Sequence, residues 1–127
     1  MDKAKQIEGL ELRAVLKGKV PSKKNRYKIA NGRIYMDPDV KGFIESAAWA
    51  FKEQRSPYSV LPWKHPVAVH ISFLTDRKSD LDNMVATIFD ALQEAGIIEN
   101  DRQIMGLTAS KEFSGFHITK VWVRSAA

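Results

Sequence analysis

Aspartates are concentrated in one part of this sequence. Asp76, Asp80 and Asp82 lie close together, and Asp101 follows after a stretch with helical periodicity. Carboxylates held near one another repel, and a hard divalent cation such as Mg²⁺ relieves that repulsion by binding their oxygens. A metal held in this way activates water and stabilises the leaving oxygen of a phosphodiester. The residue types therefore point to a magnesium site that cuts a nucleic-acid backbone.

Helix capping is the alternative explanation. Asp80 as N-cap and Asp82 in the first turn would each stabilise the following helix by about 1 kcal/mol or less. Capping is compatible with metal binding, but it does not explain why further aspartates gather near the same helix end. Residues two apart in a regular helix point about 200° apart, so a shared site requires Asp80 to lie outside the helix. The residues alone leave both explanations open.

Residues 1–35 supply the positive charge. They hold ten Lys or Arg against three Asp or Glu, while the whole chain has a net charge of +5. A basic surface beside an acidic site suits a polyanionic substrate bridged by cations. The candidate DNA contacts are in the loop that begins at Pro21 and just before Asp80, namely Lys23, Lys24, Asn25, Arg26, Arg77 and Lys78. The alternative for the loop is a solvated hairpin.

Hydrophobic periodicity predicts an α+β fold with a mixed β-sheet packed with two main helices, in a single domain over residues 1–127. Asn31-Gly32 predicts a hairpin turn, Asp37-Pro38 opens the first helix, and Gly96 ends the second. The second helix allows one parallel crossover. The expected elements are strand 10–16, hairpin 26–35, helix 38–55, strand 66–74, helix 81–95, strand 103–112 and strand 116–124. The last two strands are expected to form a C-terminal β-hairpin.

The composition excludes several classes of protein. The 127 residues include no cysteine, which rules out disulfides and thiolate zinc sites. No apolar run approaches the length of a membrane span, and the first residues lack the apolar segment of a signal peptide. Neither a phosphate-binding glycine-rich loop nor zinc-type histidine spacing is present. We therefore expect a cytoplasmic protein with no membrane contact and no nucleotide cofactor.

Several segments resemble the RusA family of Holliday-junction resolvases. The resemblance is carried by Asp76-Arg77-Lys78-Ser79-Asp80-Leu81-Asp82-Asn83, by Phe89-Asp90-Ala91-Leu92, by Asn100-Asp101, and by the basic loop with Pro21-Ser22 and Asn25-Arg26-Tyr27. It implies a homodimeric endonuclease that depends on Mg²⁺, with Mn²⁺ as a substitute metal. It implies that the enzyme nicks opposed strands of four-way DNA junctions in recombination and repair. It also implies that Asp80, Asp82 and Asp101 are the catalytic metal ligands.

The chain departs from the family at one position. The family often has a lysine four residues after the second aspartate, and Ala86 stands there in this sequence. Lys111 would lie about 33 Å along an extended strand from Asp101, so it would need a bend to reach the same site. Lys78, Lys23 or Lys24 are nearer along the chain. The departure supports a rival interpretation, a junction- or branched-DNA-binding protein with a weakened nuclease site, and a nuclease for flaps is a third.

Asp101 poses a problem of distance. Residues 82–95 as a helix carry the chain about 21 Å away from Asp82. The six residues 96–101 span about 20 Å when fully extended. Asp101 therefore rejoins its own site only if the helix frays early or the return loop runs nearly straight along the helix. The other hypothesis is that a partner chain contributes to the site.

Overall fold

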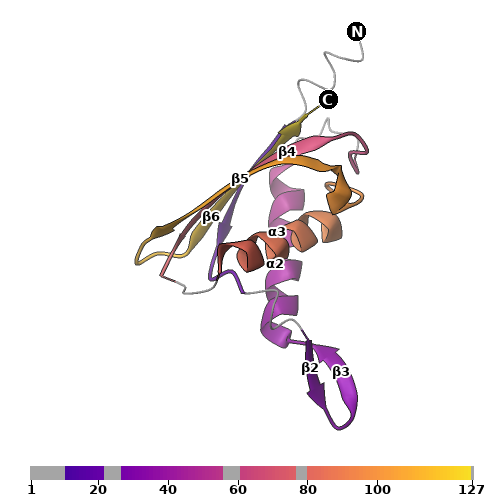
Figure 1. The fold of residues 1–127 in the computed structure, drawn as a ribbon, viewed down its shortest axis with the longest axis vertical. Helices are drawn as coiled ribbons and strands as arrows, with labels where there is room; N and C mark the ends of the chain where they lie inside the picture. Colours follow the sequence, from indigo (N-terminus) through magenta and orange to yellow (C-terminus); the bar gives the residue numbers. More distant parts are fainter. Residues whose placement is uncertain (1–10, 22–26, 56–60, 77–79, 127) are drawn as a thin grey trace.

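The structure, a computed structural model, describes residues 11–21, 27–55, 61–76 and 80–126. Helices α2 and α3 lie on one side of a four-stranded mixed sheet, and a two-stranded hairpin projects from this body (Figure 1). The expected α+β class, with a mixed sheet and two main helices, is confirmed. The elements are β1 (Glu11–Lys17), β2 (Tyr27–Ala30), β3 (Arg33–Met36), α2 (Pro38–Gln54), β4 (Val67–Thr75), α3 (Leu81–Glu94), a short 3₁₀ turn η2 (Asp101–Gln103), β5 (Ile104–Phe113) and β6 (Ile118–Ser125).

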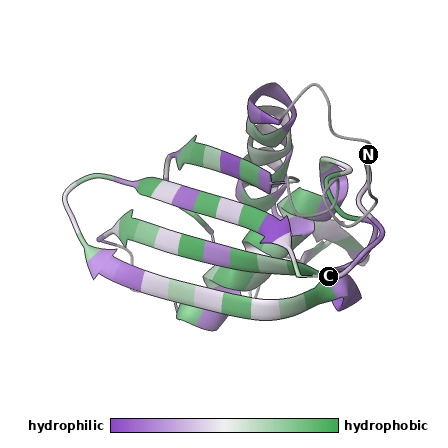
Figure 2. Ribbon diagram, turned by 90° about the horizontal axis from the view of Figure 1, so that it is seen from above, coloured by the Kyte–Doolittle hydropathy of each residue, from purple (hydrophilic) through white to green (hydrophobic). Residues whose placement is uncertain are grey.

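Alternation along the strands buries one face of the sheet. In β1, for example, Leu12, Ala14 and Leu16 are at most 3% exposed while the residues between them face solvent. Figure 2 shows the resulting stripes of apolar and polar residues along the strands. The buried stripes form one core with the apolar sides of α2 and α3. The two helices therefore cover one face of the sheet, and among the described residues no helix or strand covers the other.

The order of the strands in the sheet is β1-β6-β4-β5. β4 pairs in parallel with β5 and in antiparallel fashion with β6. The two C-terminal strands therefore run in opposite directions, as expected, but they pair on either side of β4 and not with each other. Burial explains this order, because Val121 and Val123 of β6 are at most 2% exposed, as expected for a central strand. The largely exposed β5 occupies the edge.

Helix α3 is the crossover that joins the parallel strands β4 and β5. It ends in a Schellman motif, in which the N–H of Ile97 donates to the carbonyl of Leu92 at 3.0 Å and that of Gly96 to Gln93 at 3.0 Å. Gly96 has φ 69°, a conformation that favours glycine. The helix end predicted from Gly96 is confirmed. None of the described helices is both long and apolar enough to cross a bilayer.

The hairpin of β2 and β3 turns at Asn31 and Gly32, with φ values of 53° and 74°. Two consecutive positive φ values are typical of a type I′ turn, so the turn predicted from Asn-Gly is confirmed. The hairpin extends beyond the start of α2, away from the main sheet (Figure 1). Ile29 and Ile34 pair across the two strands and are 75% and 72% exposed.

Candidate metal centre

Asp80 and Asp82 lie at the start of α3, on the side of the sheet where β4 ends. Asp80 is the N-cap residue with φ −64° and ψ 140°, and Asp82 lies in the first helical turn. Both residues are exposed, and the Asp80 side chain makes no capping hydrogen bond. Asp80 therefore lies outside the helix, as a shared site requires. Side-chain capping does not account for its carboxylate.

Asp101 lies at the other end of the same strand pair. It begins η2 immediately before β5, and the start of β5 pairs with the start of β4 at Val67. Thr75, the last residue of β4, is about 26 Å from Val67 at about 3.3 Å per residue. Among the described residues, no three Asp, Glu, His or Cys side chains come together as a metal-binding group. One chain alone therefore does not gather Asp80, Asp82 and Asp101.

Apolar side chains surround Asp101 at the edge of the sheet. A hollow of about 260 Å³ is lined by Asp101, by Phe89 of α3 and by the first residues of β5. Two of these, Met105 and Leu107, are 71% and 49% exposed. A carboxylate thus borders an exposed apolar surface on an unpaired strand edge, a combination that a second protein chain could cover.

His117 lies near the end of β4 that leads to Asp80, and the sequence did not single it out. It lies just before β6, and its Nδ1 is 2.9 Å from the hydroxyl of Thr75. Its Nε2 is 3.4 Å from a carboxylate oxygen of Asp76. His117 thus connects the start of β6 to the last residues before the segment that leads to Asp80. Only the fold reveals this, because His117 is more than 40 residues away from both partners in sequence.

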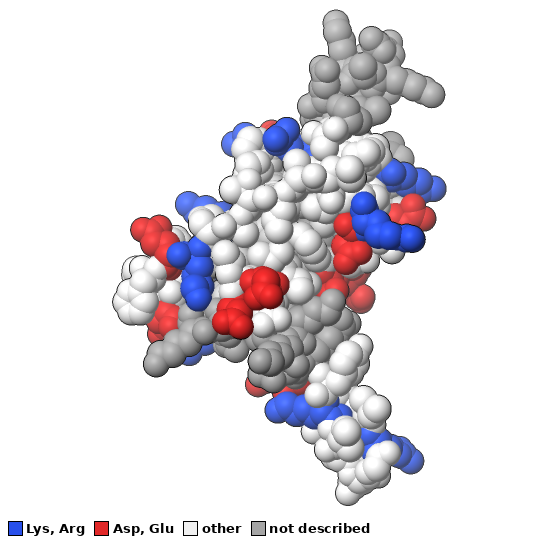
Figure 3. Space-filling view, viewed as in Figure 1, with Lys and Arg blue, Asp and Glu red and all other residues white. Residues whose placement is uncertain are grey.

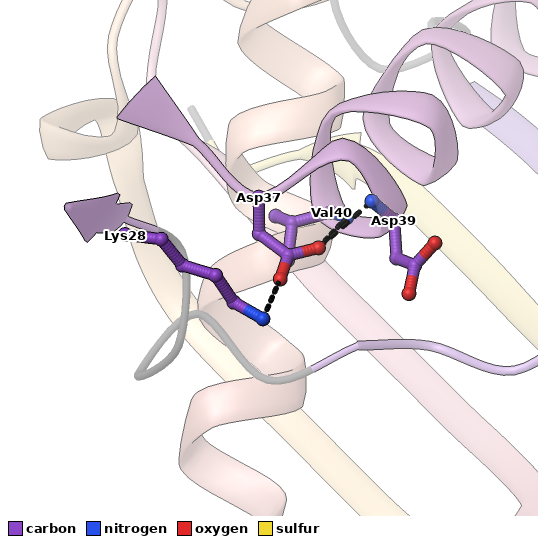
Figure 4. A network of polar contacts seen from close by, with 4 residues as sticks. All are labelled: Lys28, Asp37, Asp39 and Val40. Atoms are coloured by element: carbon purple, nitrogen blue, oxygen red, sulfur yellow. Dashed lines mark hydrogen bonds and ion pairs between the residues drawn. The ribbon is translucent and has the colours of Figure 1, made fainter. Parts of the chain in front are cut away.

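The predicted basic loop begins and ends at anchored residues. The buried hydroxyl of Thr87, on α3, donates to the carbonyl of Pro21 at 2.8 Å. At the far end, the Lys28 ammonium lies 2.8 Å from a carboxylate oxygen of Asp37, the N-cap of α2 (Figure 4). The candidate contacts Lys23, Lys24, Asn25 and Arg26 lie outside the described residues, as do Arg77 and Lys78.

The Asp37 carboxylate contacts two backbone N–H groups and one ammonium group. Its Oδ1 accepts from the backbone N–H of Asp39 at 2.8 Å and of Val40 at 3.4 Å, as expected for the predicted N-cap (Figure 4). The hydrogen bond from Lys28, with help from these N–H groups, lowers the pKa of the Asp37 carboxyl below its ordinary value. The same contact raises the pKa of Lys28. The hairpin is thereby fixed to the start of α2.

Figure 3 shows basic side chains on the projecting hairpin, and both basic and acidic side chains on the body above it. The hairpin cations among the described residues are Lys28 and Arg33. Lys111 lies on β5 opposite Phe73, near the end of β4 that leads to Asp80. The strand therefore carries Lys111 away from Asp101 and toward Asp80, whereas Ala86 is half-buried in the second turn of α3.

Comparison with known proteins gives two concordant results. Residues 18–124 match the family described as Endodeoxyribonuclease RusA. The "Crossover junction endodeoxyribonuclease RusA" of Aquifex aeolicus (strain VF5) is 30% identical over 93 residues, which is 71% of this chain and 71% of that protein. The family match includes the three predicted metal ligands and the whole of the predicted basic loop.

Proposed function

Because this chain belongs to the RusA endodeoxyribonuclease family, we propose that it nicks four-way DNA junctions with the help of Mg²⁺. The main support is Asp80, whose carboxylate lies exposed at a helix start without a capping bond. Asp82 follows in the first turn, so two carboxylates begin the same helix. Carboxylate oxygens are the ligands that Mg²⁺ prefers, and the residues fit the metal in this respect.

The complete ligand set requires a second chain in this proposal. Asp80 and Asp82 belong to one end of the β4–β5 pair, and Asp101 belongs to the other. A two-fold axis beside the middle of β5 would exchange the two ends of that strand. It would bring the partner subunit's Asp101 toward Asp80 and Asp82, and it would generate a second, equivalent site. Two sites related in this way suit paired nicks in a junction that has approximate two-fold symmetry.

The edge of β5 is the surface that we assign to this homodimer. Met105 and Leu107 expose apolar side chains there, beside the hollow that contains Asp101. An exposed edge strand also offers backbone N–H and C=O groups to another strand. Burial of this edge by a second copy would cover the apolar side chains and complete both metal sites in one step.

The chemistry of the site divides between the metal and the chain. Bound Mg²⁺ would polarise the scissile phosphate and lower the pKa of a water molecule. Asp80, Asp82 and Asp101 would hold the cation and orient it against the phosphate. We assign the flanking phosphates to Lys23, Lys24, Asn25, Arg26, Arg77 and Lys78, whose cationic and amide groups suit backbone contacts. Anchoring of Pro21 to α3 and of Lys28 to α2 supports this, because it fixes the residues on both sides of the basic loop.

Complementation between two inactive variants tests the shared site. Asp80→Asn and Asp101→Asn, each alone, should fail to nick a labelled four-way junction in Mg²⁺. In mixed dimers of the two variants, one composite site carries both substitutions and the other is wild type. If half of the dimers are mixed, about a quarter of the wild-type nicking rate should return, as single nicks without paired cuts. Wild-type protein in EDTA is the control for metal dependence.

The outcome separates the alternatives. A site formed within one chain would leave every site in the mixture defective, so no activity would return. A second candidate, a junction-binding protein with a weakened nuclease site, is favoured by Ala86 in place of the family's lysine. It predicts that wild-type protein binds junctions but does not nick them in Mg²⁺ or Mn²⁺.

A further inference from the structure

The face of the sheet opposite α2 and α3 carries an ordered row of side chains. Arg13 on β1, Trp122 on β6 and His70 on β4 are neighbours across three strands. The guanidinium carbon of Arg13 lies 4.7 Å from the centre of the Trp122 ring. The His70 ring stacks on Trp122 with centroids 5.3 Å apart and planes inclined by 30°. These side chains belong to none of the contacts assigned above to the nuclease.

A hollow of about 440 Å³ lies over the centre of this face. The strand register places Lys120 next to Ser72 and Ser72 next to Ser110, one row along from Trp122 and His70. These residues line the hollow together with Thr108 and Arg13. The hollow is therefore lined by three hydroxyl side chains and two cations, among side chains that are otherwise mainly apolar or aromatic. Hydroxyls, guanidinium and ammonium groups are the side chains that contact phosphate and sugar.

Glu11 holds the row in place. The indole N–H of Trp122 donates to Glu11 Oε2 at 3.0 Å. The other carboxylate oxygen lies 3.6 Å from Nε of Arg13. Arg13 is thus oriented both by the ring beneath it and by the carboxylate beside it. A guanidinium held in this way loses less conformational freedom when it binds an anion.

The net positive charge of this face favours a polyanionic partner. Its outward residues include four cations, Arg13, Lys17, Lys120 and Arg124, and two carboxylates, Glu11 and Glu112. Packing two copies of this face together would oppose like charges, whereas a polyanion would be attracted. We propose that this uncovered sheet face, centred on Arg13 and Lys120, binds the sugar–phosphate backbone of a DNA arm.

The geometry favours backbone contacts over stacking of unpaired bases. Arg13 and His70 approach Trp122 from the two strands that flank β6, so both sides of the indole ring are occupied. A base would have to displace one of them before it could stack on the indole. The hollow, in contrast, already has Ser72, Ser110 and Lys120 among its lining residues, and these side chains suit contacts with a phosphate. Binding here should therefore depend on charge and not on whether the DNA is single-stranded.

This inference rests on the proposed function, in that DNA is the substrate, but its test measures binding without cleavage. The Arg13→Ala/Lys120→Ala double variant should bind both linear duplex and four-way junction about tenfold more weakly in EDTA. Loss of two phosphate contacts should reduce the slope of log Kd against log salt by about 2. Fluorescence anisotropy over a salt series measures both quantities. Glu11→Gln keeps an oxygen acceptor for Trp122 and removes a negative charge that repels phosphate, so it should bind more tightly than wild type.

A matched control removes two exposed cations from elsewhere, as Lys52→Ala/Lys64→Ala. Equal Kd values for the control and the Arg13/Lys120 variant would overturn the proposal, as would a change of oligomeric mass in the Arg13/Lys120 variant alone. If the double variant does not fold, Lys120→Ala and Glu11→Gln must still shift Kd in opposite directions. Absence of nicking by wild type would refute the proposed function but leave this binding result interpretable.

Discussion

Asp80 occupies the N-cap position of α3, but its side chain makes no capping hydrogen bond. An aspartate at an N-cap ordinarily stabilises its helix by about 1 kcal/mol through a side-chain bond to a backbone N–H. Asp37 makes such bonds at the start of α2, while the Asp80 side chain makes none at the start of α3. Local rules are broken most often at functional sites, where another demand determines the side chain's position. The contrast between these two aspartates supports a ligand role for Asp80.

Ala86 allows a test of the missing lysine. Ala86→Lys introduces a cation one turn after Asp82 on an element whose backbone tolerates lysine well. A cation there would stabilise charge that develops at the scissile phosphate, so we expect kcat for junction nicking to rise about tenfold with KM nearly unchanged. Single-turnover kinetics on a labelled junction measure the effect.

Ala86→Gln is the matched control, because glutamine is also a long helix former but carries no charge. An increase with glutamine as large as with lysine would contradict an electrostatic role. If neither variant is faster, another cation fills the role. Lys111 is then the first to replace by Met, since β5 carries it toward the Asp80 end of the sheet.

Among the helices and strands, the sequence predicts turns and helix ends well, but it predicts the order of strands in the sheet poorly. The turn at Asn31-Gly32 and the end of α3 at Gly96 depend on backbone conformations that only a few residues adopt, so both could be predicted. The position of β6 between β1 and β4 depends on which strand buries more apolar surface against distant partners. The contact of His117 with Thr75 follows from that position and therefore carries no sequence signal.

The contact between the hairpin and α2 predicts a pH dependence of stability. Lys28 and the backbone N–H groups lower the pKa of Asp37 below its ordinary 3.8. The ionised carboxylate therefore stabilises the fold above pH 3.8, and this contribution is lost as the pH falls through the lowered pKa. Asp37→Asn keeps an acceptor for the N–H of Asp39 but loses the charge. Wild type should thus melt at a higher temperature than Asp37→Asn near pH 7, and the difference should shrink below pH 3.8.

Thermal melts followed by circular dichroism across this range measure the difference. Lys28→Met is the control, because it removes the ion pair and leaves the cap intact. Since the contact also raises the pKa of Lys28, the wild-type advantage should decline again above pH 10.5. A constant difference between wild type and Asp37→Asn from pH 3 to pH 7 would show that the charge on Asp37 contributes nothing.

The candidate site, taken over the complete fold, is only partly predictable from the sequence. The residue types and their order indicated Asp80, Asp82 and Asp101, and chain length alone showed that Asp101 could barely return to its own site. The parallel pairing of β4 with β5 explains why it does not return, because it places Asp80 and Asp101 at opposite ends of these strands. The bare sheet face could not be foreseen, since Arg13, His70 and Trp122 come from three distant segments.

Dimer formation through β5 gives the last prediction. Leu107 is 49% exposed, so Leu107→Lys should leave the fold of a single chain nearly unchanged. At a two-fold interface the same lysine would be buried close to its own symmetry mate, which is unfavourable for a charge. We therefore expect the variant to sediment as a monomer and to lose junction nicking while its circular dichroism spectrum is retained. Ile29→Lys, on the hairpin and 75% exposed, is the control for a new cation at an apolar surface position. If Ile29→Lys dissociated the dimer and Leu107→Lys left it intact, the interface would lie on the hairpin and not on β5.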